Sequence, residues 1–293
     1  MTTITGIRAG RDTGPHAGTR AGISVSGLVR NVLVIGVALL WLLPSYLVIV
    51  NATVPNDEYA GPRTWFGSFG LFQNIAAAFE AASIGKAMLN SLAYSVGAAL
   101  IAVFVAALAS FAVVVMPVRR PALWFWAIYT GTLLPLQVFL SPLFSGYAST
   151  SLYDTQYGML LIYAAVAIPF AFFLIRNYLT TTPREMMEAA QLDGCGWLSM
   201  FLRIHLPLAR GALLAAFLFQ FLATWNDLLF GLTLSSSPNV RPVMAALAEL
   251  NGQYSAIGPP VVLAAGLIAS VPTVALFFAF QRFFVNSLRL TPS

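Results

Sequence analysis

Apolar residues occupy the chain in long runs that charged residues interrupt only at intervals. Five runs contain no charged side chain, a sixth contains only Asp227, and each is about 20 residues or longer, the length that a helix needs to cross the hydrocarbon core of a bilayer. The runs lack both the 3.6-residue polar stripe of a soluble helix and the alternation of a membrane β-barrel. We therefore predict an all-α integral membrane protein with six transmembrane helices, near Val32–Val50, Met88–Met116, Leu123–Phe144, Tyr157–Ile175, Ala212–Leu234 and Val261–Phe284.

Composition and charge agree with this prediction and add an orientation. Charged residues are 9% of the 293 residues, against ~25% in an ordinary soluble domain. Of 15 basic residues, all but Arg63, Lys86 and Arg241 would share one side of the membrane with the N-terminus. The positive-inside rule then places both termini in the cytoplasm. No Lys/Arg cluster with interleaved aromatic residues occurs, so we expect no nucleic-acid partner.

The chain is expected to contain one membrane domain and a short leader. Residues 1–27 are rich in Gly, Thr, Arg and Ala and predict a flexible cytoplasmic segment. Residues 28–293 would form the six-helix domain, and the amphipathic stretch Phe72–Ala82 an additional helix outside the lipid. One cytoplasmic loop, 177–211, is much longer than a simple connection requires.

This loop carries clear signals for a short helix. Thr182-Pro183-Arg184-Glu185 predicts its start, since Thr182 can cap, Pro183 suits the first turn and Glu185 completes a capping box. Gly194 supplies the left-handed conformation that ends a helix. A second helix is predicted from Trp197 to Ile204. The apolar side chains expected to be exposed on the first helix are Met186, Met187, Ala189, Ala190 and Leu192.

Two interpretations of the short helix follow. Methionines and alanines suit close contact with a partner, and the carboxylates of Glu185 and Glu188 would face a basic surface. The alternative is an amphipathic helix that packs against the chain's own bundle. After it, Leu206-Pro207-Leu208 is expected to turn the chain back to the membrane.

Sequence motifs favour the first interpretation. Glu188-Ala189-Ala190, then Gly194, then Ile204-His205-Leu206-Pro207 resemble the EAA motif of ABC-importer permeases. The resemblance covers about residues 31–286, with Cys195 in place of the usual alanine and Gly211 in place of a frequent proline. Further segments resemble the MalG-like branch, the second permease subunit of binding-protein-dependent carbohydrate importers: Leu133-Leu134-Pro135, Pro142-Leu143-Phe144, Tyr153-Asp154-Thr155, Ile168-Pro169-Phe170 and Trp225-Asn226-Asp227.

The resemblance implies a type I ABC-importer permease bundle in a bacterial inner membrane, with a cytoplasmic coupling helix. It implies a second, non-identical permease, two ATPase subunits that hold ATP and Mg, and an external solute-binding protein. The transported solute would be a sugar, oligosaccharide or related polyol. The residues assigned to ATPase coupling are Glu185, Glu188, Ala189, Ala190, Asp193, Gly194 and Pro207.

The chain itself lacks the residues of an ATPase or another enzyme. The only lysine, Lys86, has Glu80 where a phosphate-binding loop needs its first glycine. Neither histidine belongs to a catalytic or metal motif, and His205 is expected at the membrane edge, near headgroups or loop backbone. We therefore expect no catalytic residue, metal site or bound cofactor in this chain.

Asp227 supports the rival interpretation, because an acid in a span is a functional-site hypothesis by default. The chain would then be a stand-alone ion- or proton-coupled transporter. A structural role within the bundle or facing a vestibule is the alternative. The residues considered for a translocation path are Phe139, Tyr163, Trp225, Asn226 and Asp227, although packing is the simpler interpretation of the aromatic ones.

Overall fold

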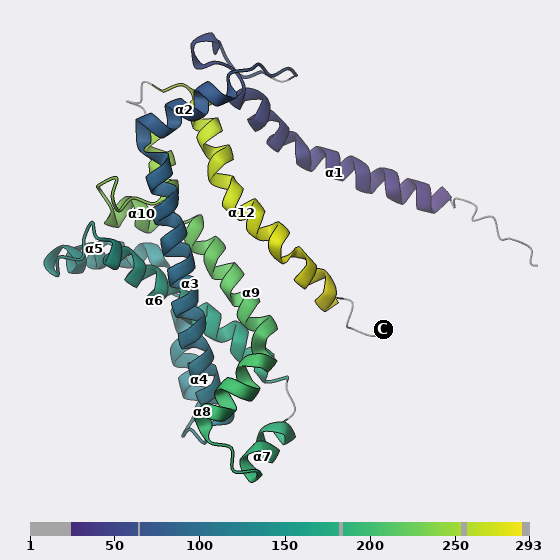
Figure 1. Cartoon of the computed structure of the whole chain (residues 1–293), viewed down its shortest axis with the longest axis vertical. Coiled ribbons are helices and arrows are strands. Elements are labelled where there is room, and N and C mark those ends of the chain that lie inside the picture. Colours follow the sequence, from purple (N-terminus) through teal and green to yellow (C-terminus); the bar gives the residue numbers. More distant parts are fainter. Residues whose placement is uncertain (1–24, 64, 182–183, 253–256, 289–293) are drawn as a thin grey trace, which may run out of the picture. The chain divides into compact units, whose positions relative to one another are not determined.

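The computed structural model describes residues 25–63, 65–181, 184–252 and 257–288, and every regular element within them is a helix (Figure 1). The chain divides into two compact units, residues 1–46 and 47–293. Most of α1, Val25–Ala52, belongs to the first unit, and the helix contains the predicted span Val32–Val50. The predicted leader lies outside the described residues up to position 24, and helix has already formed at Val25.

Five helices in the described ranges are long and apolar enough to cross a membrane: Leu28–Ala52, Ile84–Val115, Gln156–Leu179, Trp197–Trp225 and Pro259–Gln281. A bent pair, Pro121–Thr132 and Leu136–Ser149, passes the same test jointly, so the number rises to six if this pair is one span. The prediction of six spans is confirmed in this sense.

The third predicted span, Leu123–Phe144, is wrong in its shape. Helix α4 (Pro121–Tyr129) and helix α5 (Leu140–Ser149) meet at 82°, with short 3₁₀ turns between them. Pro135 explains the break, because its ring removes a backbone donor and disfavours helical geometry at Leu134. The sequence run contains no charged residue, so the distribution of charge gave no sign of the bend.

The fifth predicted span, Ala212–Leu234, is also interrupted. Helix α9 (Leu206–Trp225) ends at Trp225, and the short α10 (Leu229–Leu234) begins after a three-residue break. The helix that contains α9 also begins earlier than the predicted Ala212, because it is continuous from Trp197. The break coincides with Asp227, the one charged residue of the run.

Three helices of the second unit, α3 (Ile84–Val115), α6 (Gln156–Leu179) and α9, run side by side and form its centre (Figure 1). Their shared core consists largely of alanine. Small side chains let helix backbones approach closely, which is how membrane helices gain packing energy without a hydrophobic driving force. The buried alanines of this core are Ala102, Ala106, Ala167, Ala171, Ala209, Ala212 and Ala216.

The other helices of the second unit pack around this centre or against one another. The predicted amphipathic helix is confirmed as α2 (Leu71–Ala82), and its buried Asn74 donates to the carbonyls of Ala52 and Val54 at 2.9 and 2.7 Å. Helix α11 (Val243–Leu250) and the long α12 (Pro259–Leu288) pack against α2.

The start of α6 offers a test of close packing. Thr155 caps the helix by accepting from the Gly158 amide at 3.0 Å, and a Cβ at Gly158 would lie 2.3 Å from the Leu152 carbonyl. We expect Gly158→Ala to destabilise the fold by about 1–3 kcal/mol, the usual cost of overpacking. Thermal unfolding in detergent measures it. Gly146→Ala in α5 is the control, since nothing lies within 4 Å of a Cβ there; equal melting temperatures for the two variants would contradict the packing argument.

Candidate functional site

The predicted short helix is present as α7, Arg184–Leu192. Thr182 and Pro183, which carry the predicted start, lie outside the described residues. The predicted end is confirmed: Gly194 has φ +75°, its amide donates to the Gln191 carbonyl at 3.0 Å, and the Cys195 amide donates to the Ala190 carbonyl at 3.0 Å. These two bonds form a Schellman motif, the arrangement in which glycine ends a helix in the left-handed conformation.

Helix α7 has two faces. Met187 and Ala190 are half-buried and pack, with Cys195, against a cluster built on Phe111, Met200 and Phe201. The expectation that Met187 and Ala190 are exposed is therefore wrong, because their spacing of three puts both on the face toward the bundle. The α7 side chains outside this packed face are exposed: Glu185, Met186, Glu188, Ala189, Gln191 and Leu192, the last with 89% of its surface free. Asp193 and Gly194 are exposed as well.

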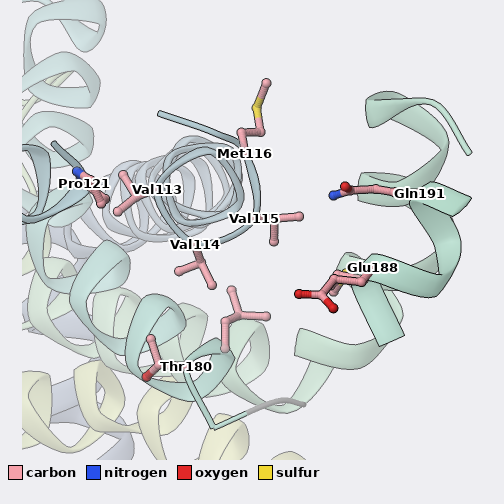
Figure 2. A pocket seen from close by; sticks show the side chains of 10 residues that line it. Val113, Val114, Val115, Met116, Pro121, Thr180, Glu188 and Gln191 are labelled. Carbon is pink, nitrogen blue, oxygen red and sulfur yellow. The ribbon is translucent and has the colours of Figure 1, made fainter. Parts of the chain in front are cut away.

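A cleft of about 390 Å³ lies between α7 and the ends of α3 and α6 (Figure 2). Glu188 and Gln191 project from α7 across it, toward the end of α3. The opposite wall is mainly apolar. The lining residues are Val113, Val114, Val115, Met116, Pro121, Leu179, Thr180, Met187, Glu188 and Gln191.

The carboxylates of α7 have no basic partner among the side chains that the structure describes, where the single ion pair joins Arg241 and Glu249. Glu185, Glu188 and Asp193 are exposed. An exposed acid beside an apolar wall can receive a basic side chain, because the aliphatic stem covers the wall while the cationic head reaches the carboxylate.

The connection from α7 to the membrane differs from the prediction. Helix α8 (Trp197–Met200), a π-helical turn at Phe201–His205 and α9 form one continuous helix, so Leu206-Pro207-Leu208 does not turn the chain back. The Leu206 amide donates to the Phe201 carbonyl five residues earlier. This wide turn lies immediately before Pro207, which lacks an amide hydrogen, and π turns are a known way to carry such an interruption within a helix.

His205 is buried inside the protein. Its side chain is 0% exposed and sits between aromatic rings, 4.9 Å from the Phe111 centroid and 5.4 Å from that of Phe201. The expectation of contact with headgroups is wrong because the helix continues through this position rather than turning. In the described parts of the chain no three His, Cys, Asp or Glu side chains are grouped to hold a metal ion.

Asp227 is bonded inside the chain. Its Oδ2 accepts from the Tyr163 hydroxyl at 2.9 Å and from the amides of Phe230 and Gly231 at 3.0 and 3.2 Å. The carboxylate therefore satisfies two free amides in the first turn of α10 and joins α10 to α6. These contacts explain why the fifth span is interrupted at this residue.

The other residues considered for a translocation path do not form one surface. Trp225 is 2% exposed, donates from Nε1 to the Ala269 carbonyl at 3.1 Å and stacks on Phe221. Tyr163 is 4% exposed. Asn226 is exposed but donates to the Leu222 carbonyl at 2.8 Å, whereas Phe139, near the α4–α5 bend, is 41% exposed.

Sequence reasoning missed a polar set at the start of α3. Lys86, Asn90 and Tyr94 all donate to the segment that joins α10 to α11. A signal was present, since the three residues are spaced by four and so share one helix face at the beginning of an otherwise apolar run.

Comparison with known proteins places this architecture in a family. Residues 105–290 match the family described as binding-protein-dependent transport system inner membrane component. The alpha-glucoside transport system permease protein AglG of Rhizobium meliloti is 34% identical over 221 residues, which are 73% of this chain and 58% of AglG. The sn-glycerol-3-phosphate transport system permease protein UgpE of Yersinia pestis is 30% identical over 267 residues, or 87% of this chain and 93% of UgpE.

A solved structure shares the fold. A chain in the crystal structure of a bacterial ABC transporter involved in the import of the acidic polysaccharide alginate superposes with a TM-score of 0.75 at 19% identity, covering 89% of this chain and 97% of that one. The family match covers more than half of this chain, and UgpE is 30% identical to it over most of both chains. The chain belongs to the family of binding-protein-dependent transport system inner membrane components, and is a non-catalytic permease subunit of an ABC importer.

Proposed function

We propose that this permease imports a sugar, oligosaccharide or related polyol together with a second, non-identical permease, two ATPase subunits and an external solute-binding protein. The chemistry of the relatives supports the substrate class, because the names of AglG and UgpE specify alpha-glucosides and a glycerol phosphate. Both termini face the cytoplasm, as the distribution of basic residues indicates. ATP and Mg are bound by the partner ATPases.

The observation that carries the coupling role is the two-sided structure of α7. One face packs on the permease's own cluster through Met187 and Ala190, and the other leaves Met186, Ala189 and Leu192 exposed. A surface helix with apolar side chains on both faces is suited to binding a second surface. We assign that surface to an ATPase subunit.

Glu188 is the residue that we assign to a salt bridge with the ATPase. It projects into the cleft, where the valines at the end of α3 form the wall (Figure 2). An arginine of the partner could lay its stem along these valines and pair with the carboxylate, and partial desolvation would strengthen that pair relative to an exposed one. Glu185 and Asp193 extend the acidic surface.

Force from the ATPases would enter through α7 and continue into the bundle. The Schellman motif fixes the angle at which the chain leaves α7, and α8, the π turn and α9 then continue as one helix through Pro207. When ATP binding closes the ATPases, displacement of α7 would therefore move α9 and switch access between the two sides of the membrane.

A structural role for Asp227 is more consistent with its contacts than proton relay. A relay needs a group that exchanges its proton with a path, whereas this carboxylate receives three donors from the chain itself. We assign Tyr163 and Trp225 to packing, and leave Phe139 and Asn226 as the exposed members of a path.

Gly194→Val tests the coupling helix. Valine in the left-handed conformation costs at least about 1–2 kcal/mol, so we expect the end of α7 to be distorted, and ATP hydrolysis in the purified assembly to continue with little substrate transport. Transport in proteoliposomes and ATPase activity are the two measurements.

Gly196→Val is the matched control for Gly194→Val. Both glycines are exposed with nothing within 4 Å of an added Cβ, but Gly196 has φ −69° and accepts a side chain. Gly194→Asn should retain transport, because asparagine tolerates the left-handed region. Normal transport by Gly194→Val would rule out the assigned role of this turn.

Glu188→Arg tests the docking surface itself. Charge reversal should remove the ATPase subunits from assemblies purified through a tag on this chain, while the second permease is retained, as quantified by mass spectrometry. Glu80→Arg, an exposed acid on α2, is the control. Undiminished ATPase recovery with Glu188→Arg would contradict the salt bridge, and absence of any ATPase from the wild-type preparation would contradict the proposed function.

Asp227→Asn separates the importer from a proton-coupled transporter. Asparagine keeps an acceptor oxygen for the same donors but cannot exchange a proton. We expect ATP-dependent uptake in proteoliposomes to persist, with no response to an imposed pH gradient in either protein. Uptake that is driven by the gradient in the wild type and lost in Asp227→Asn would support the rival function.

A further inference from the structure

Two consecutive arginines occupy the turn between α3 and α4. Arg119 and Arg120 are exposed, and neither forms an ion pair, since the single pair in the described part of the chain joins Arg241 and Glu249. Arg120 adopts the left-handed conformation, with φ 58°, and its carbonyl accepts from the Leu123 amide at 3.0 Å as α4 begins. The partial positive charge of this helix N-terminus adds to the charge of the two side chains.

A third arginine, Arg176 in the last turn of α6, contacts α4. Its guanidinium carbon lies 4.6 Å from the centroid of the Phe125 ring. Its Nη1 donates to the Asn177 side chain at 3.3 Å, but its buried Nε has no acceptor within the described ranges. An aromatic face attracts such a cation without neutralising it, and partial burial of a charge is costly unless the charge is paired.

Acidic residues are scarce around these three arginines. The sequence contains none between Glu80 and Asp154 and none between Asp154 and Glu185. Asp154 precedes the first turn of α6, at the opposite end of that helix from Arg176, and accepts from the amides of residues 236 and 237 at 2.9 Å each. The acids of α7 form no ion pair with any arginine that the structure describes. The three cations therefore suit an anion from outside the chain.

Two exposed tryptophans follow within the first two turns of α4. Trp124 and Trp126 have 53% and 57% of their surfaces free, and Trp126 packs edge-on against Phe125 with 5.5 Å between the ring centroids. Helix α4 begins the bent pair that is apolar enough to be one span, so these indoles lie where the chain enters the bilayer. Tryptophan is favoured at that depth because its ring is apolar and its N–H is polar. Arg119 and Arg120, which precede them, then lie at the level of the headgroups.

The position of the turn identifies the leaflet. Pro121, directly after Arg120, lines the cleft beside α7 together with Thr180 at the end of α6 (Figure 2). Helix α7 faces the cytoplasm in the proposed function, so the turn lies at the cytoplasmic surface of the membrane. Anionic lipids attract basic residues at that surface.

We propose that Arg119, Arg120 and Arg176, with Trp124 and Trp126, form a binding site for the headgroup of an anionic phospholipid in the cytoplasmic leaflet. The choice of leaflet rests on the proposed function, whereas the site itself does not. Guanidinium groups bind phosphate oxygens through paired N–H donors, and the indoles pack against the glycerol and the upper acyl chains. A headgroup held in this way fixes the turn that forms one wall of the cleft beside α7.

Fluorescence quenching tests the site in the complete assembly, reconstituted in nanodiscs. A bimane label on the exposed position Ala122→Cys, in a Cys195→Ser background, reports on lipids beside the turn. We expect spin-labelled phosphatidylglycerol to quench this label at a lower mole fraction than spin-labelled phosphatidylcholine. Arg119→Gln combined with Arg120→Gln should reduce the preference about fivefold for each arginine, the effect of one basic residue at an anionic surface. Lysine at both positions should retain most of the preference, because the charge remains.

Arg203→Gln combined with Arg210→Gln is the matched control. Both arginines are exposed near the start of the continuous helix that contains α9, so the same charge is removed at the same end of the bundle. The preference for phosphatidylglycerol at the label should equal that of the parent protein. Equal losses in the two double variants would reveal a general effect of net charge and overturn the proposal.

Three other outcomes also overturn it. Equal quenching by the two lipids in the labelled parent protein would show that the turn does not select an anionic headgroup. Little quenching by either lipid would show that a protein subunit covers the turn. Loss of the preference in inorganic phosphate, but not in chloride at equal ionic strength, would identify a site for a free anion. Failure of the proposed function is distinguishable, because the measurement needs neither ATP hydrolysis nor transport: an assembly without an ATPase that retains the preference would contradict the proposed function alone.

Discussion

Backbone amides and carbonyls that enter a bilayer must find partners within the protein, because lipid offers none. This requirement explains the irregular places in the permease better than any single packing contact does. Where the fifth predicted span is interrupted, Asp227 accepts from the amides that begin α10. Immediately before Pro207, the π turn at Phe201–His205 keeps the helix continuous.

The same requirement separates what could be predicted from the sequence from what could not. The number of spans was predictable because a charge-free run of sufficient length has few alternatives. The end of α7 was predictable because Gly194 acts locally, through its own φ angle. The break at Asp227 was not, since its hydroxyl partner Tyr163 is 64 residues away in the chain. The face of α7 that is buried was also unpredictable, because Phe111 and Met200, which cover it, belong to other elements.

Part of the candidate site falls between these cases. Lys86, Asn90 and Tyr94 are visible in the sequence as one polar face, but the carbonyls that they bind lie about 150 residues later, in a segment with no motif of its own. A polar face at the beginning of an apolar run is also compatible with contact to headgroups. Only the fold decides between these roles, by placing residues 236–241, which join α10 to α11, against this face.

Alanine packing and polar anchoring make different contributions to the position of α3. The alanines that α3 shares with α6 and α9 bring the backbones close, but small side chains interdigitate little and specify a register weakly. Hydrogen bonds are directional and lose most of their strength within small displacements. The register of α3 is therefore set mainly at its ends, by the bonds to residues 236–241 at one end and by the cluster around Phe111 at the other. A helix that is closely packed along its length, but fixed in register only at its termini, can shift as one body when either terminus is displaced.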